Sequence, residues 1–229
     1  MVDGNRLRAL REQRGWTQRQ ASRRLRVTQA YLSMLENGRR PTPPRLLHAL
    51  ARVFDLPATS LPLPSAASVT PDSQLAEALA ALGYPGFRHL VSSAGPMRNP
   101  ADVLAAALCQ PGLDARVVEA LPWLAFEYSD LDWNWLVREA KLRDLQNRLG
   151  YVVLLARKLA DKLDRPEAAR RLRGVEQALE QSRLAREDSL AGDALSEAER
   201  QWLRARRPTD AKHWNLLTDL TVEQLQHAS

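Results

Sequence analysis

Apolar residues at intervals of three and four recur along nearly the whole chain, and this spacing constrains the fold more than any other feature. It is the period of a helix that buries one face, whereas a strand on a sheet surface alternates apolar and polar residues. Segments with that alternation are missing from the sequence. We therefore expect an all-α protein.

The chain has 229 residues, which is enough for one small and one larger domain without a stabilising metal or disulfide. Cys109 is the only cysteine, so we expect a buried thiol and no intrachain disulfide. Met1 is not followed by a signal-peptide pattern, and no run of about 18 apolar residues occurs. These features predict a cytoplasmic protein that does not contact a membrane.

A segment over residues 63–73, LPSAASVTPDS, is rich in proline, serine and alanine and has no apolar period. Such a composition indicates a linker. We therefore expect a first domain over residues 1–62, a linker over 63–73 and an all-helical domain over 74–229.

The positive charge of the chain is concentrated in the first domain. The whole chain has a formal charge of +6, but residues 1–62 hold twelve arginines against four acids, a net +8, and the remainder carries −2. A compact domain with such an imbalance favours a polyanion, because binding releases the counterions that surround phosphates.

Several helix starts in the larger domain are marked by side chains that can accept hydrogen bonds from free backbone amides. They include Thr70, Asn99, Ser129 and Ser196. From Leu131 to Leu163 the apolar spacing predicts one long helix, and a second helix follows Pro166. The short connection predicts an antiparallel hairpin, with an intermolecular seam that forms a dimer as the alternative.

Two short helices joined by a three-residue turn are predicted in the first domain. Thr17 with Gln20 forms a capping box for the first of them, and Thr28 caps the second, which ends at Asn37 and Gly38. This is helix-turn-helix geometry, in which the second helix of the pair can lie in the major groove of DNA.

The first domain resembles the Cro/C1-type (XRE-family) helix-turn-helix domain over residues 5–61. The matching segments are LRALREQRGWTQ, VTQAYLSMLENGRRPTP and LLHALARVFDLP. The resemblance implies five helices that bind double-stranded DNA. Arg26 stands where the family commonly has glycine, so a left-handed backbone at this position is expected to cost about 1 kcal/mol.

By the same resemblance, the helix that starts at Thr28 faces DNA. The implied base-facing residues are Gln29, Ala30, Ser33 and Met34. Thr28 and Gln18 are implied to contact phosphates, and Arg19, Arg39 and Arg40 are further candidates for the DNA backbone. Glu36 is expected to be structural, either pairing with an arginine of the first helix or capping the helix that follows.

No catalytic, cofactor or metal site is predicted. The histidines His48, His89, His213 and His227 have no metal-ligand spacing with cysteine or acids. Phosphate-binding loops, nucleophile elbows and paired-carboxylate motifs are missing from the sequence. We therefore expect that the protein is not an enzyme.

The tryptophans of the larger domain predict a core, with a partner surface or ligand pocket as the alternative. A pocket lined by some of Trp123, Trp133, Trp135 and Tyr151 would make the protein a ligand-sensing regulator. The basic and aromatic run over residues 200–217 is a second candidate for contact with phosphate or with an acidic protein.

The region over residues 122–221, from PWLAFEYSDLDWNWLVREAKLRDLQNRLGYVV to HWNLLTDLT, resembles the C-terminal regions of regulators found beside nucleotidyltransferase toxins of the abortive-infection type. This resemblance implies an antitoxin whose residues 74–229 neutralise a toxin and whose first domain represses the shared operon. Our main expectation is a homodimeric repressor on a pseudo-palindromic operator, because one helix-turn-helix reads only a few base pairs.

Overall fold

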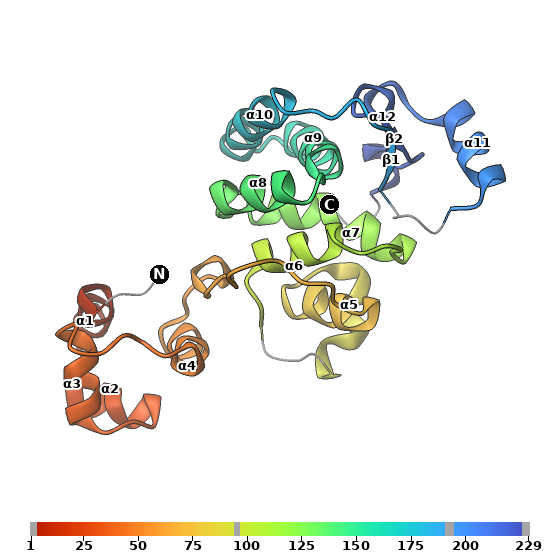
Figure 1. Ribbon diagram of the computed structural model, residues 1–229. Coiled ribbons are helices and arrows are strands. Elements are labelled where there is room, and N and C mark those ends of the chain that lie inside the picture. The colour runs from red at the N-terminus through yellow and green to blue at the C-terminus, as the bar shows by residue number, and fades with distance from the viewer. Residues whose placement is uncertain (1–3, 94–96, 191–194, 226–229) are drawn as a thin grey trace. The chain divides into compact units, whose positions relative to one another are not determined.

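Helices form nearly all of the regular structure in the residues that the computed structural model describes, which are 4–93, 97–190 and 195–225 (Figure 1). This agrees with the apolar spacing of the sequence. The chain separates into two units, Met1–Leu63 and Pro64–Ser229. None of the helices in the described ranges combines the length and apolar composition needed to cross a membrane.

The first unit contains four α-helices and one short 3-10 helix. They are α1 (Gly4–Gln13), α2 (Gln18–Leu25), α3 (Gln29–Glu36), α4 (Pro44–Phe54) and η1 (Ala58–Ser60). Their apolar faces enclose one core, in which Leu7, Leu32 and Leu50 are fully buried. The fifth helix of this unit is therefore a single 3-10 turn.

The helix-turn-helix pair begins and ends where the sequence predicts. Thr17 Oγ1 accepts the N–H of Gln20 at 3.2 Å, and Gln20 Oε1 accepts the N–H of Thr17 at 2.9 Å. Thr28 Oγ1 caps α3 by accepting the N–H of Tyr31 at 3.2 Å. Gly38, with φ of +67°, supplies the left-handed conformation that ends α3.

The second unit is built mainly from helices around α9. Its elements are α5 (Asp72–Ala81), η2 (Pro85–Ser93), α6 (Pro100–Leu108), α7 (Ala115–Glu127), α8 (Trp133–Leu142), α9 (Gln146–Lys162), α10 (Pro166–Glu180), β1 (Asp188–Ser189), α11 (Glu197–Arg206), α12 (Thr209–His213), β2 (Leu216–Leu217) and η3 (Val222–Gln224). α9 contacts α7, α8 and α10, and most of its side chains are buried. β1 and β2 form a parallel ladder of two residues each, too short to leave an alternating pattern in the sequence.

α9 and α10 run antiparallel and are joined by residues 163–165. Arg157 Nε donates to Glu176 Oε2 at 2.5 Å, and one turn further along α9, Asp161 lies 3.9 Å from Arg173. Residue numbers thus rise along one helix as they fall along the other. The apolar seam of α9 is therefore buried within one chain.

The prediction of one long helix from Leu131 to Leu163 is wrong. Two helices, α8 and α9, take its place, separated by residues 143–145. Asp144 has φ of +57°, a left-handed conformation that no α-helix contains, and Leu142 is 72% exposed. Because the leucine spacing continues across the break, the periodicity could not show where α8 ends.

Two of the predicted helix caps are also wrong. The Thr70 hydroxyl donates to the carbonyl of Ser68 at 3.4 Å and makes no bond to α5. α8 is capped by Asp132, whose Oδ1 accepts the N–H of Trp135 at 3.0 Å, and not by Ser129. The predicted caps Asn99 and Ser196 are present at α6 and α11.

Candidate nucleic-acid interface

The turn between α2 and α3 depends on the backbone of Arg26. This residue has φ of +55° and ψ of +41°, and its N–H bonds the carbonyl of Arg23 at 3.2 Å. Val27 N–H then bonds the carbonyl of Ser22 at 3.0 Å. Arg26 thus adopts the left-handed conformation expected where the Cro/C1-type family commonly has glycine.

α3 has one face in the core and one outside it. Leu32, Leu35 and Glu36 are buried. Side chains four positions apart share a face of a helix, so 29 and 33 form one row and 30 and 34 form the next. Gln29 and Ala30 are exposed, and Ser33 and Met34 are half-buried. The four residues assigned to the bases therefore lie together on the side away from the core.

The residues assigned to phosphates flank this face. Thr28 is exposed at the start of α3, and Arg19, Arg39 and Arg40 are exposed in α2 and just after α3. The free amides at a helix start favour an anion. Gln18 is half-buried, and its Nε2 donates to Glu36 Oε2 at 2.9 Å, so Glu36 competes with any phosphate for this side chain.

Arg11 and Glu36 fix α3 relative to α1. Arg11 Nε donates to Glu36 Oε1 at 2.7 Å and Arg11 Nη2 to Glu36 Oε2 at 3.1 Å, and both side chains are buried. The bonds to Glu36 raise the pKa of Arg11, which keeps this guanidinium charged. Arg11 Nη1 also donates to the Trp16 carbonyl at 2.9 Å. This is the structural role expected for Glu36 as the partner of an arginine in the first helix.

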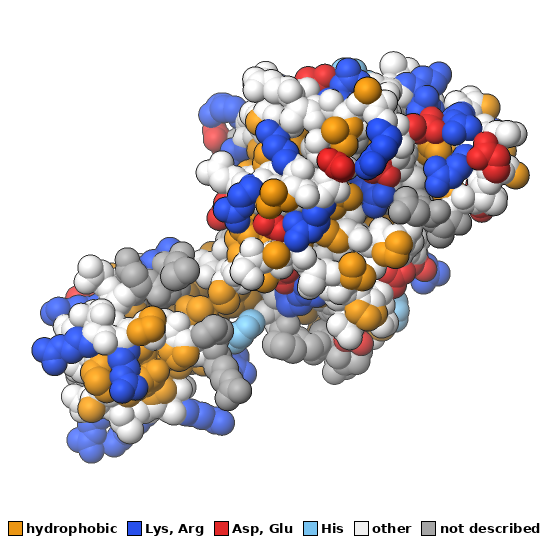
Figure 2. Space-filling model, in the orientation of Figure 1, with side chains coloured by type: hydrophobic (Ala, Val, Ile, Leu, Met, Phe, Trp, Pro, Cys, Tyr) orange, Lys and Arg blue, Asp and Glu red, His pale blue; other side chains and the backbone are white. Residues whose placement is uncertain are grey.

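The acids described in this unit are all bound by arginines of the same unit. Glu12 bonds Arg8, Glu36 bonds Arg11, and Asp55 lies 3.0 Å from Arg14. Seven exposed arginines have no carboxylate within ion-pair distance among the described residues. They are Arg19, Arg23, Arg24, Arg26, Arg39, Arg40 and Arg52. Figure 2 shows the resulting excess of basic side chains on the visible surface of this unit. Arg23 and Arg26 had no role assigned from the sequence.

The aromatic residues named for a possible ligand pocket make packing contacts and hydrogen bonds in the second unit. Tyr151 is fully buried, and its hydroxyl donates to the Leu220 carbonyl at 2.5 Å. Trp123 packs on Tyr84 and Tyr128, with ring centroids 5.2 and 6.4 Å apart. Trp135 is buried as well, and Trp133 donates its indole N–H to the Ser129 carbonyl at 3.0 Å.

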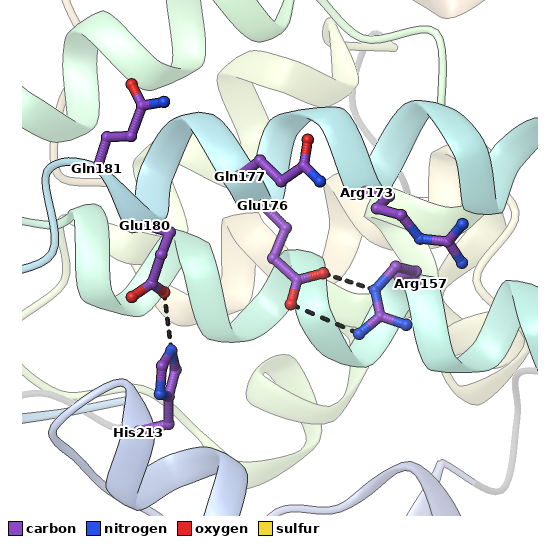
Figure 3. Close-up of a pocket in the computed structure, with 7 residues that line it drawn as sticks. All are labelled: Arg157, Arg173, Glu176, Gln177, Glu180, Gln181 and His213. Carbon is purple, nitrogen blue, oxygen red and sulfur yellow. Dashed lines mark hydrogen bonds and ion pairs between the residues drawn. The ribbon is translucent and has the colours of Figure 1, made fainter.

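An open groove of about 760 Å³ lies along α10, beside α9 and α12 (Figure 3). Its carboxylates already have partners, because Glu176 binds Arg157 and Glu180 lies 2.8 Å from His213 Nε2. Two arginines and two glutamates line it, so the groove lacks the positive excess that phosphates require. In the described ranges no three histidine, cysteine or acidic side chains are grouped to hold a metal ion, and His227 lies outside those ranges.

Residues 4–62 match the family of helix-turn-helix domains. Comparison with curated proteins and comparison with solved structures each gave no match for the chain. The family match covers α1 to α4 and η1, and it includes every residue assigned to DNA. Residues 4–62 of this chain are therefore a helix-turn-helix domain, the kind of domain with which regulators bind DNA.

Proposed function

We propose that the protein is a homodimeric transcriptional repressor that reads a pseudo-palindromic operator through α3. The observation that carries this proposal is the outer face of α3. Its residues Gln29, Ala30, Ser33 and Met34 lie away from the core, in a unit whose described acids are all engaged by arginines.

The side chains of this face suit base edges in the major groove. The Gln29 amide can donate to N7 and accept from N6 of one adenine, and the Ala30 methyl can pack on a thymine methyl. A good bidentate contact of this kind discriminates between bases by about 1–3 kcal/mol. Arg39 and Arg40 are exposed just beyond α3, where they add phosphate contacts that carry no sequence information.

The proposed dimer follows from the limited reach of one α3. Eight residues of helix contact only a few base pairs, so two copies on half-sites about 34 Å apart are needed for a specific site. Repression follows if the operator overlaps the promoter of the regulated gene. Sedimentation of the full chain with and without operator DNA measures the number of copies bound.

The test of this proposal is equilibrium binding of the full chain to the DNA upstream of its own gene, with a scrambled duplex as competitor. We expect the combined variant Gln29→Ala, Arg39→Ala, Arg40→Ala to weaken binding at least about tenfold. The control is Arg170→Ala with Arg171→Ala, which removes two exposed charges from α10 and should leave the affinity unchanged. Equal binding by the wild type and the combined variant contradicts the proposal.

A second candidate function, binding of a partner protein such as a toxin, is favoured by α11. This helix has no buried side chain, and its Trp202 is 46% exposed with the Arg206 guanidinium 4.6 Å from the ring centroid. Tryptophan and arginine are enriched at binding hot spots. Co-expression with the product of the adjacent gene tests this function. Loss of the complex in Trp202→Ala supports it, and an unchanged complex excludes α11 as the contact.

A further inference from the structure

A cavity of about 440 Å³ in the second unit has more arginines in its lining than any other residue type. Four arginine side chains and two carboxylates border it, which is an excess of two positive charges. The arginines come from separate parts of the chain: Arg143 follows α8, Arg148 lies in α9, Arg186 precedes β1, and Arg200 lies in α11. The fold thus gathers cations that the sequence places up to 57 residues apart.

Both carboxylates of the cavity are neutralised by arginines. Asp188 receives two bonds of 2.7 Å from Arg148. Glu187 receives a bond of 2.7 Å from Arg204 and one of 3.4 Å from Arg207, neither of which lines the cavity. These acids therefore do not balance the charge of the remaining arginines.

The remaining arginines keep donors for a ligand. Arg186 and Arg200 have no carboxylate within ion-pair distance in the described part of the chain, and Arg200 Nε donates one long hydrogen bond, of 3.4 Å, to the Leu195 carbonyl. Arg143 uses Nη1 and Nη2 for Glu139 and the Ala67 carbonyl. Arg148 is buried and bonds the carbonyls of Leu108 and Gln110, so it forms a fixed part of the wall.

We propose that this cavity binds a small molecule through a phosphoryl group. The volume lies within the range of small-molecule sites. Guanidinium groups match phosphoryl oxygens with paired hydrogen bonds, and a phosphoryl group offers three such oxygens and up to two negative charges. Arg186 and Arg200 supply the ligand contacts, and Arg148 adds fixed positive charge.

Cys109 provides a reporter inside the cavity. It lines the wall, is partly exposed and is the only cysteine of the chain, so any thiol alkylation reports on this one position. Burial raises the pKa of its thiol, so the reaction with the neutral reagent iodoacetamide is best followed at about pH 9.

The experiment titrates the full chain with pyrophosphate by calorimetry and measures the Cys109 alkylation rate at matched ionic strength. We expect pyrophosphate to bind the wild-type protein and to slow the alkylation of its Cys109. In the Arg186→Gln, Arg200→Gln variant we expect about a tenfold loss of affinity for pyrophosphate. The matched control, Arg170→Gln with Arg171→Gln, removes two exposed charges from α10 and should leave both readouts unchanged.

Two results overturn the proposal: no binding of pyrophosphate at about 10 mM, or wild-type affinity in the Arg186→Gln, Arg200→Gln variant. Both arginines are at least partly exposed, so the variant is expected to fold, and its circular dichroism verifies this. Neither readout involves DNA. Failure of this site is therefore separate from failure of the proposed repressor function.

Discussion

Arg11 of α1 and Glu36 of α3 form a buried ion pair joined by two hydrogen bonds, of 2.7 and 3.1 Å. Only 8% of Arg11 and 2% of Glu36 are exposed. Because Glu36 also accepts a bond from Gln18, this pair connects the start of α2 to the helix proposed to read DNA. The position of α3 thus depends on a charged cluster as well as on the leucine core.

Replacing Glu36 with glutamine should destabilise the first unit by about 3–5 kcal/mol, because the buried Arg11 guanidinium would keep only the exposed Glu12, 3.3 Å away, as a counter-charge. Hydrogen exchange of α1 and α3 peptides in the full chain measures this free energy of unfolding. Glu12→Gln is the control, since Glu12 is exposed and should cost less than about 1 kcal/mol. Similar exchange in the two variants contradicts a structural role for the pair.

Replacing Arg26 with glycine should stabilise the first unit by about 0.5–1 kcal/mol relative to Arg26→Ala. Both variants lose the charge, but only glycine adopts the left-handed conformation without steric strain. Part of this gain is offset because glycine raises the conformational entropy of the unfolded chain. The same hydrogen-exchange measurement applies. A glycine variant less stable than the alanine variant would show that the turn is not strained.

Much of the first unit could be predicted from the sequence because its signals are local. Thr17, Gln20, Thr28 and Gly38 act on backbone groups within four residues, so their spacing specifies the helix ends. The two-sided character of α3 follows from its short apolar pattern in the same way. The left-handed backbone of Arg26 could be expected only from the resemblance to the Cro/C1-type family, which commonly has glycine at this position.

The second unit was less predictable because its determinants are distant in the sequence. The break at Asp144 interrupts a leucine pattern that continues on both sides, so no local signal marks it. The arginine-lined cavity joins residues from the segment after α8, from α9, from α11 and from the segment before β1. The pairing of Glu187 with Arg204 could not be predicted from the amino-acid composition or from the spacing of apolar residues.

Gly150 of α9 is required because Trp214 packs directly against it. A Cβ at position 150 would lie 2.2 Å from Trp214 Cζ3, and Trp214 is fully buried. Gly150→Ala should therefore destabilise the second unit by about 1–3 kcal/mol, as measured by urea unfolding with hydrogen exchange of α9. Gly174→Ala in α10 meets nothing within 4 Å and should instead stabilise by about 0.5–1 kcal/mol. If Gly150→Ala and Gly174→Ala changed the stability equally, the contact with Trp214 would not be the reason for glycine at position 150.

Ala67, in the segment predicted as a linker, is held on both sides by one ion pair. Its N–H donates to Glu139 Oε2 at 3.0 Å, and its carbonyl accepts from Arg143 Nη2 at 3.1 Å. Arg143→Ala should release this segment and raise its cleavage rate by elastase about tenfold, the effect of losing one charge-assisted bond. Arg138→Ala is the control, because Arg138 is exposed and lies 3.9 Å from Glu139. Unchanged cleavage of Arg143→Ala would show that other contacts hold Ala67.

The central claim is that the outer face of α3 reads base sequence. The most direct measurement compares the affinities of wild type and Gln29→Ala for the operator and for operators carrying each single base-pair substitution. We predict that wild type loses about 1–3 kcal/mol at one adenine·thymine pair per half-site, and that Gln29→Ala no longer distinguishes bases at that position. If Gln29→Ala keeps the wild-type discrimination at every position, α3 does not read the operator as proposed.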